Sequence, residues 1–223
     1  LKPASVFHYF EEICKVPRPS KKEEKIIAYL MKFAEEQGLE AKKDEAGNIL
    51  MKKPATPGKE NLKTVILQSH IDMVCEKNSD STHDFLNDPI ETYIDGEWLK
   101  AKGTTLGADN GIGMAAQLAV LAANDIEHGP IECLFTVDEE TGLTGAFALK
   151  EGFMDGDILI NLDSVDEGEL FIGCAGGANT TAEFAYEEIG APQDFFLFQV
   201  AIKRLTGGHS GVDINKIRAN AKK

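Results

Sequence analysis

The sequence has 223 residues and a hydrophobic fraction of 43%, which suits one large domain with part of a second and excludes a disordered chain. Its 37 acidic residues outnumber 23 basic ones and give a net charge of −14. Such a surface repels nucleic acids and anionic membranes, so neither is expected as a partner, whereas cations are attracted. No apolar run approaches the roughly 20 residues that a membrane span requires.

Four cysteines, Cys14, Cys75, Cys133 and Cys174, are widely spaced and form no C-x-x-C pair. This spacing is typical of free thiols in a reducing compartment. The first residues, LKPASVFHYF, lack the layout of a signal peptide, and they lack an initiator Met, which indicates a trimmed N-terminus. We therefore expect a cytoplasmic protein.

Two helices are predicted near the N-terminus. A short one covers Ser5 to Cys14, and a clearer one runs from Ser20 to Gln37. Ser20 and Glu23 have the spacing of a capping box, and Gly38 suits the end of the helix. The second helix has one apolar stripe, formed by Ile26, Ile27, Leu30, Met31 and Ala34.

Strands and helices then alternate along the chain. The pattern predicts strands at residues 48–52, 64–68, 131–137 and 158–162, and helices at residues 109–124 and 143–150. A polar loop over residues 77–97 is expected to end in a small hairpin near residues 93–99. Because the strands are continuous apolar runs, the prediction is an α/β fold with a mostly parallel sheet flanked by helices.

The pattern changes toward the C-terminus. A glycine-rich segment follows Leu170, a further strand is predicted at residues 195–203, and a helix begins at residues 213–221. The helix has no closing signal before Lys223. We expect a first domain at residues 1–185, itself incomplete, and the truncated start of an α+β domain at residues 186–223.

Groups that can bind metal recur where predicted strands end or helices begin. They are His70 with Asp72, Asp109, the run Asp138-Glu139-Glu140, and Asp163. Each alone has an ordinary explanation, such as a helix cap or a solvated turn. Together, this many carboxylates at one sheet edge repel each other unless cations compensate. One imidazole with several carboxylates matches the preferences of zinc.

The spacing within these groups suggests a division of labour. Residues two apart on a strand share a face, so Asp72 can support the imidazole of His70 and fix its tautomer. Glu139 and Glu140 are neighbours on a turn and point in different directions. One of the two can bind a metal ion while the other carries a proton.

Four motifs in this order resemble those of the M20 metallopeptidases: SHIDMV, GADNGIG, TVDEETGLTGA and NLDS. GCAGG and GGHSGVDINKIRANA are similar to the aminoacyl-histidine (Xaa-His) dipeptidase branch of that family. The resemblance implies a zinc-peptidase-like catalytic domain followed by a lid and dimerisation domain. It further implies hydrolysis of dipeptides by a water activated by two divalent ions, zinc first, with manganese or cobalt as alternatives. A small peptide would be the substrate, and the full-length form would be a homodimer.

The resemblance also implies a ligand set. His70 and Asp163 would bind one ion, and Asp109 would bridge both ions. Glu140 would bind the second ion. A cis peptide is expected between Asp109 and Asn110.

Three further residues receive catalytic roles by resemblance. Glu139 would act as general base and then as general acid. Asp72 would orient His70. His209, in the lid domain, would steady the substrate carbonyl as negative charge develops.

One departure from the family pattern concerns the second ion. The family also uses a histidine near the C-terminus of the full protein, and no residue here matches it. His8, His83 and His128 are poor candidates from their sequence context. The alternative is therefore a catalytically incompetent fragment that serves as a binding or dimerisation module.

Other protein classes share some of these sequence features. Within the family, an amidohydrolase acting on N-acyl amino acids would use the same metals. A serine hydrolase is disfavoured because Gly208-His209-Ser210-Gly211-Val212 lacks the G-x-S-x-G spacing. A nucleotide-binding loop at Gly107, Gly111 and Gly113 is disfavoured because no GK[ST] follows and Asp109 would repel phosphate.

Overall fold

A computed structural model describes residues 1–164, 168–174, 176, 180–190, 194–196 and 198–201. The chain divides into two compact units, Leu1–Glu167 and Gly168–Lys223. The described residues of the second unit form neither helix nor strand. They include 195–196 and 198–201 of the strand predicted at 195–203, whereas the rest of that strand lies outside the described residues. The helix predicted at 213–221 lies outside the described residues, and the domain boundary at 185 stays a prediction.

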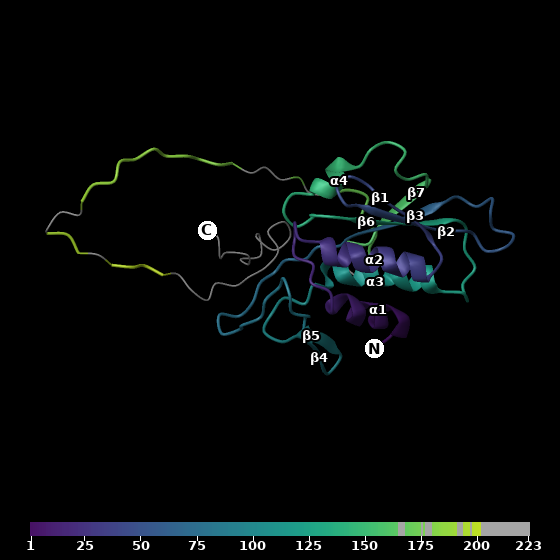
Figure 1. Cartoon of the computed structure of the whole chain (residues 1–223), viewed down its shortest axis with the longest axis horizontal. Coiled ribbons are helices and arrows are strands. Elements are labelled where there is room, and N and C mark those ends of the chain that lie inside the picture. The colour runs from purple at the N-terminus through teal and green to yellow at the C-terminus, as the bar shows by residue number, and fades with distance from the viewer. Residues whose placement is uncertain (165–167, 175, 177–179, 191–193, 197, 202–223) are drawn as a thin grey trace. The chain divides into compact units, whose positions relative to one another are not determined.

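The first unit holds the helices and strands of the described chain (Figure 1). In chain order they are α1 (Ala4–Cys14), α2 (Glu24–Glu36), β1 (Glu40–Lys43), β2 (Ile49–Lys53), β3 (Val65–His70), β4 (Thr92–Asp95), β5 (Trp98–Ala101), α3 (Ala108–Ala122), β6 (Ile131–Thr136), α4 (Thr144–Ala148) and β7 (Ile158–Asn161). No helix in this part of the chain is both long and apolar enough to cross a membrane.

A five-stranded sheet has the order β1-β2-β6-β3-β7. β3 runs parallel to both β6 and β7, whereas β2 pairs antiparallel with β6 and with β1. The α/β class is confirmed, and the sheet is mixed because the β1–β2 hairpin extends its parallel part. The sequence of β1, EAKK, has no apolar alternation, which is why it was not predicted. β4 and β5 form the separate hairpin expected near residues 93–99.

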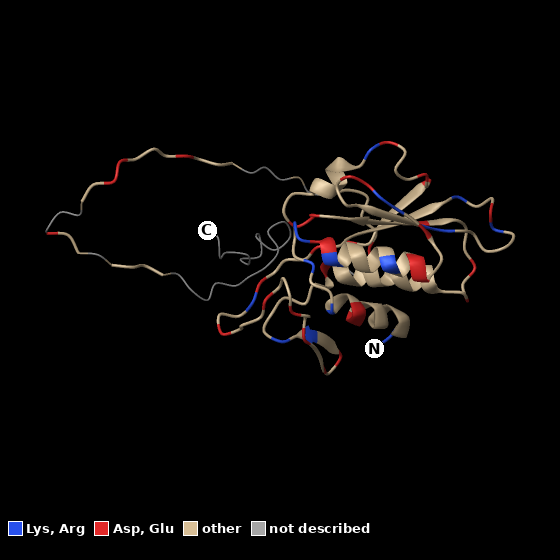
Figure 2. Ribbon diagram, in the orientation of Figure 1, with Lys and Arg blue, Asp and Glu red and all other residues tan. Residues whose placement is uncertain are grey.

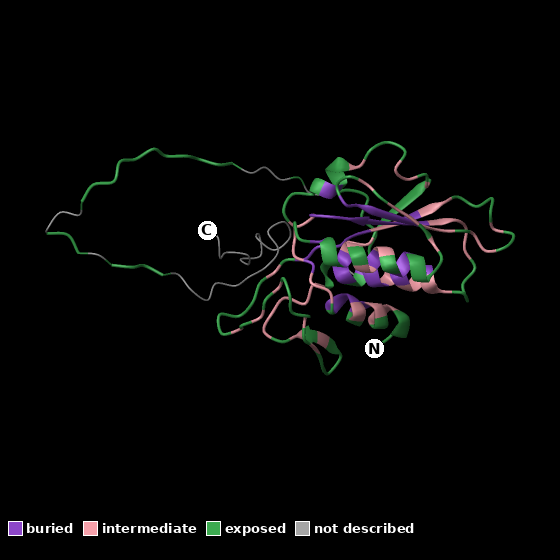
Figure 3. Ribbon diagram, viewed as in Figure 1, coloured by how far each residue is buried: buried purple, intermediate pink, exposed green. Residues whose placement is uncertain are grey.

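One face of the sheet carries the main core. Figure 1 shows α1, α2 and α3 together on this face, and Figure 3 shows their buried sides turned toward it. Met51 and Cys133 belong to this core, whereas their neighbours Leu50 and Leu134 belong to a small cluster on the opposite face. Strand residues therefore alternate between two apolar layers. Charged residues lie mainly on loops and exposed helix surfaces (Figure 2).

The start of α2 differs from the prediction. The helix begins at Glu24, its N-cap is Glu23, and no side chain caps it. The capping box was wrong because the hydroxyl of Ser20 donates to Asp72 instead, and Glu23 accepts the N–H of Lys21. A tertiary contact to a buried carboxylate thus replaces the local helix cap.

Helix α3 is tied to the sheet by a buried side chain. The amide nitrogen of Gln117 donates to the carbonyls of Leu67 in β3 and Leu134 in β6, at 2.7 and 3.1 Å. The hydroxyl of Ser69 donates to the Gln117 side-chain oxygen. These bonds satisfy a fully buried amide and fix α3 against two neighbouring strands.

The C-terminal end of α3 is held by a cation. The ammonium of Lys53 donates to the carbonyls of Val120, Leu121 and Ala123. The last carbonyls of a helix lack partners within the helix, and a positive charge there is favourable.

Candidate metal centre

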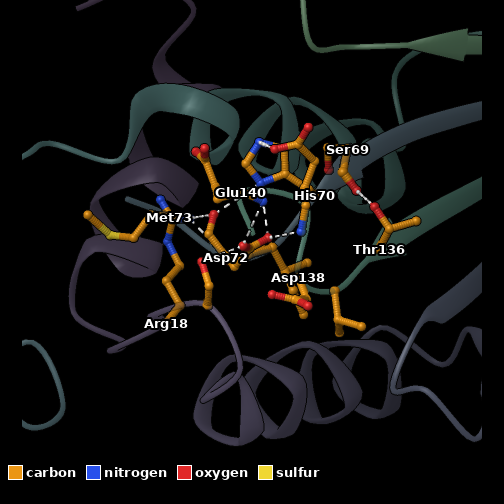
Figure 4. Close-up of polar contacts among 12 residues, drawn as sticks. Arg18, Ser69, His70, Asp72, Met73, Thr136, Asp138 and Glu140 are labelled. Carbon is orange, nitrogen blue, oxygen red and sulfur yellow. Dashed lines mark hydrogen bonds and ion pairs between the residues drawn. The ribbon is translucent and has the colours of Figure 1, made fainter. Parts of the chain in front are cut away.

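His70 is the last residue of β3 and is 1% exposed. Its Nδ1 lies 3.1 Å from the carbonyl oxygen and 3.3 Å from Oδ1 of Asp72. Its Nε2 lies 2.9 Å from Oδ1 of Asp109. One side of the ring is therefore held by Asp72, and the other side faces a group of carboxylates (Figure 4).

These carboxylates come from three other segments of the chain. The Nε2 atom of His70 lies 3.8 Å from Oδ2 of Asp163 and 3.9 Å from Oε2 of Glu139. Ligand atoms of His70, Asp109 and Glu140 all lie within 4.8 Å of one another. The structure thus brings together every acidic residue that the sequence nominated as a metal ligand, around one imidazole.

The backbone around Asp109 departs from regular helical geometry. Gly107, with a φ of 70°, precedes it in the left-handed conformation, and Asp109 and Asn110 depart from helical φ and ψ within α3. The peptide between Asp109 and Asn110 is cis, as the resemblance implied. The side chain of Asp109 is 64% exposed, so solvent ions can reach the group.

The turn after β6 is organised by Asp138. This residue has a φ of 51°, and its carboxylate accepts hydrogen bonds of 2.5 Å from the hydroxyls of Thr141 and Thr144. Asp138 is buried, so it shapes the turn and leaves the metal-facing positions to Glu139 and Glu140.

Asp72 does more than contact His70. Its two carboxylate oxygens accept the backbone N–H groups of Glu139 and Glu140 at 3.0 and 3.2 Å. One of them also accepts the hydroxyl of Ser20 at 2.7 Å. This fully buried carboxylate therefore links the imidazole to the turn that carries both glutamates. Figure 4 shows Asp72 between His70, Glu140 and Arg18.

The charged residues of this group shift one another's pKa values. Burial opposes the charged form of His70, but its hydrogen bonds with Asp109 and Asp72 outweigh that effect and raise its pKa to about 10. Burial likewise opposes ionisation of Asp72, yet the bonds from His70, Glu139 N–H and Ser20 hold its pKa at about 2. Asp72 is thus a stable anion beside the imidazole.

The outer carboxylates are shifted in the opposite direction. Burial and the negative charge of Asp109 raise the pKa of Glu140 to about 7 and that of Asp163 to about 6. This crowding of like charge is relieved when a cation supplies positive charge at the same place.

Further buried polar residues support the site. The sequence predicted the supporting role of Asp72 but not the participation of Glu23 and Arg18. Glu23, Asp72 and Asp138 are all buried with oxygens within 4.8 Å of one another. Glu23 also accepts the N–H of Asp138 at 3.1 Å. Arg18, 2% exposed, donates to backbone near Asp72. The contacts that join these residues to one another span long sequence separations, such as 115 positions between Glu23 and Asp138 and 54 between Arg18 and Asp72, so no local pattern predicts them.

The remaining histidines are placed elsewhere or not described. Among the described residues, His70 is the histidine found in a candidate metal group. His83 packs its ring against Phe85, and His128 bonds the carbonyl of Gly129 through Nδ1. His209 lies outside the described residues, so its predicted role stays a prediction.

Residues 66–212 match the model of peptidase family M20/M25/M40. The chain belongs to this family. Cytosol non-specific dipeptidase of Escherichia coli (strain K12) is 50% identical over all 223 residues, which cover 46% of that protein. The chain thus spans about half the length of this curated relative. The M20 resemblance stated from the motifs is confirmed.

Solved structures support the same grouping. Aminoacylhistidine dipeptidase from Vibrio alginolyticus matches with a TM-score of 0.74 and 60% identity, over 75% of this chain and 34% of that one. A tripeptidase from Staphylococcus aureus matches with a TM-score of 0.62 and 26% identity, over 73% and 43% of the two chains. M20 peptidases are metal-dependent, and the cluster around His70 is the candidate metal site here.

Proposed function

We propose that this chain carries the metal-binding part of a dipeptidase of the Xaa-His type. The observation that supports this most strongly is the convergence of carboxylates from three segments on Nε2 of His70. Relatives named as a cytosol non-specific dipeptidase and an aminoacylhistidine dipeptidase point to dipeptides as the substrate class.

The residues present fit divalent ions. One imidazole nitrogen and several carboxylate oxygens form a donor set that suits zinc, and manganese or cobalt as well. His70 is presented correctly, because Asp72 holds Nδ1 and leaves Nε2 directed at Asp109. In the proposal, His70 and Asp163 would hold one ion, Glu140 would hold the second, and Asp109 would serve both.

Bound ions would supply Lewis-acid polarisation of the peptide carbonyl and would lower the pKa of a water molecule. Glu139 would accept the proton of that water and return it to the leaving amine. Its backbone N–H is fixed by Asp72, and its carboxylate reaches to 3.9 Å from Nε2 of His70. Asp72 would keep both His70 and Glu139 in place.

Other parts of the proposal rest on relatives and sequence motifs. His209 would steady the substrate carbonyl from a lid domain that begins in residues 186–223. A cytoplasmic location, a small peptide substrate and a homodimeric full-length form belong to the same proposal.

A matched pair of variants tests the division between the two glutamates. Glu139→Gln should retain wild-type metal content and lose hydrolysis of Xaa-His dipeptides. Glu140→Gln should lose metal, because it removes a ligand charge. Metal content is measured by elemental analysis after dialysis, and hydrolysis by release of free histidine. Equal metal loss in both variants would contradict the assignment.

A substrate panel separates dipeptidase from amidohydrolase activity. Dipeptides and N-acyl amino acids are offered at equal concentrations to the metal-loaded chain. Preference for N-acyl amino acids would overturn the dipeptidase proposal. Bound metal without turnover of either substrate class would favour the binding or dimerisation module. This alternative is included because the chain covers 46% of the Escherichia coli relative.

A further inference from the structure

Arg18 lies buried beneath the candidate metal site and contacts two separate segments of the chain. Its Nη1 donates to the carbonyls of Ile71 and Asp72, at 3.2 and 2.8 Å. Its Nη2 donates to the carbonyl of Gly107. Figure 4 shows Arg18 beside Asp72 and Met73. One guanidinium therefore joins the loop after β3 to the start of α3.

Both segments carry nominated metal ligands. Ile71 directly follows His70, and Gly107 precedes Asp109 by two residues. The backbone of Arg18 adds to the connection, because its carbonyl accepts the N–H of Met73 at 3.2 Å. Arg18 thus joins the two backbone segments that carry His70 and Asp109, whose Nε2 and Oδ1 atoms lie 2.9 Å apart.

Two glycines of the GADNGIG motif leave space for this guanidinium. A Cβ added at Gly107 would lie 2.5 Å from Nη2 of Arg18, and one added at Gly111 would lie 2.7 Å from the same atom. Gly107 also has a φ of 70°, which disfavours any other residue. The close approaches of Arg18 and of the Phe10 ring, whose Cε2 would lie 2.9 Å from the added Cβ, together explain Gly111, whose own conformation does not require glycine.

We propose that Arg18 is a positioning residue that sets the spacing of His70 and Asp109 for metal binding. This inference rests on the proposed metal site. The planar guanidinium can donate to carbonyls on two segments at once, whereas the single nitrogen of a lysine cannot reproduce this fork. Its positive charge also lies near the acidic cluster, where Asp72 and Asp109 both act on it electrostatically.

A purely structural role is the alternative, and the chain offers a matched control. Lys53 is also a cation that donates to three backbone carbonyls, and it does so at the opposite end of α3. Loss of either cation should lower stability. Only the loss of Arg18 should change how a metal ion is held.

The experiment titrates the wild-type chain, Arg18→Lys, Arg18→Met and Lys53→Met with Co²⁺ alone. The visible absorption of Co²⁺ reports ligand geometry, and circular dichroism reports folding of each variant. Arg18→Lys and Arg18→Met should bind Co²⁺ about ten- to a hundredfold more weakly, the range for residues that support metal ligands. Their spectra should change as well. Lys53→Met should keep the wild-type affinity and spectrum while its melting temperature falls.

Each outcome of the titration supports or overturns the role proposed for Arg18. Wild-type affinity and spectrum in the Arg18 variants would overturn the inference and leave the proposed function intact. An equal loss of affinity in Lys53→Met would overturn it too, because general destabilisation would then suffice. If Arg18→Met does not fold, Arg18→Lys, which keeps charge and most of the volume, decides alone. No Co²⁺ binding by the wild-type chain would overturn the proposed function and this inference with it.

Discussion

The hydroxyl of Ser20 donates a 2.7 Å hydrogen bond to Oδ2 of Asp72, although the two residues are 52 positions apart. Asp72 is fully buried, so this bond replaces water that the carboxylate lost on folding. The segment between α1 and α2 therefore takes part in holding the residue that contacts His70.

Ser20→Ala should remove one donor from this buried anion. The free energy of unfolding should fall by about 1.5–3 kcal/mol, the range for hydrogen bonds to charged groups. Ser5→Ala, at an exposed position of α1, should change it by less than about 0.5 kcal/mol. Urea denaturation of both variants measures the difference, and equal effects would contradict the importance of this bond.

Divalent ions should stabilise the folded chain through His70. At a free ion concentration of one hundred times Kd, the free energy of unfolding should rise by about 2.7 kcal/mol for one site. His70→Ala should abolish this increment, whereas His128→Ala should retain it because the His128 ring contacts the carbonyl of Gly129 through Nδ1 and its bonds to Thr56 are made by the backbone, which the substitution leaves in place. Thermal unfolding with added Zn²⁺ and with a chelator checks the prediction. An increment that survives in His70→Ala would place the ion elsewhere.

Stability should depend on pH through Glu23. Burial raises its pKa above the ordinary 4.5, and the charge of Asp72 acts in the same direction. Between the unfolded and folded pKa values the folded state binds more protons than the unfolded state. The contribution of Glu23 is therefore most favourable below pH 4.5 and is lost as pH rises through the folded pKa.

Glu23→Gln should remove that dependence. The variant should gain stability relative to wild type as pH rises from below 4.5 through the raised pKa that Glu23 has in the folded chain. Glu24→Gln, at an exposed neighbouring position, should leave the profile unchanged. Urea midpoints measured at several pH values give the comparison, and parallel profiles for wild type and Glu23→Gln would refute it.

Gly145→Ala should disrupt the turn that carries Glu139 and Glu140. A Cβ at residue 145 would collide with the carbonyl oxygen of Val137 and lie 2.6 Å from Oδ1 of Asn48. Overpacking of this kind costs about 1–3 kcal/mol. Gly173→Ala, where the added Cβ meets nothing within 4 Å, is the control. Denaturant unfolding reports both, and a harmless Gly145→Ala would mean that the turn adjusts.

The sequence predicted the elements whose signals are local. Apolar periodicity located α2, β3 and β6, although the ends differ by a few residues. The polar residues at strand ends led to His70 and Asp163, because side chains after parallel strands gather at one sheet edge. The edge strand β1 was missed, since its position depends on pairing with β2 rather than on its own pattern.

Long-range polar contacts could not be predicted in the same way. Ser20 has the spacing of a helix cap, and only the folded chain shows that a buried carboxylate takes its hydroxyl. Nothing near Arg18 in the sequence indicates that its partners are the carbonyls of residues 71, 72 and 107. Such contacts depend on how distant backbone segments meet, which no local pattern encodes.

Arg18 and Lys53 hold helix α3 from its two ends, one at Gly107 and the other at Val120 to Ala123. The helix is therefore fixed along its axis as well as against the sheet. A slip by one residue would shift Asp109 by about 1.5 Å relative to His70. Functional groups must be held to within about 0.5 Å, so the bond from Arg18 to Gly107, two residues before Asp109, protects the site against axial sliding, whereas Lys53 stabilises the distant end of the helix.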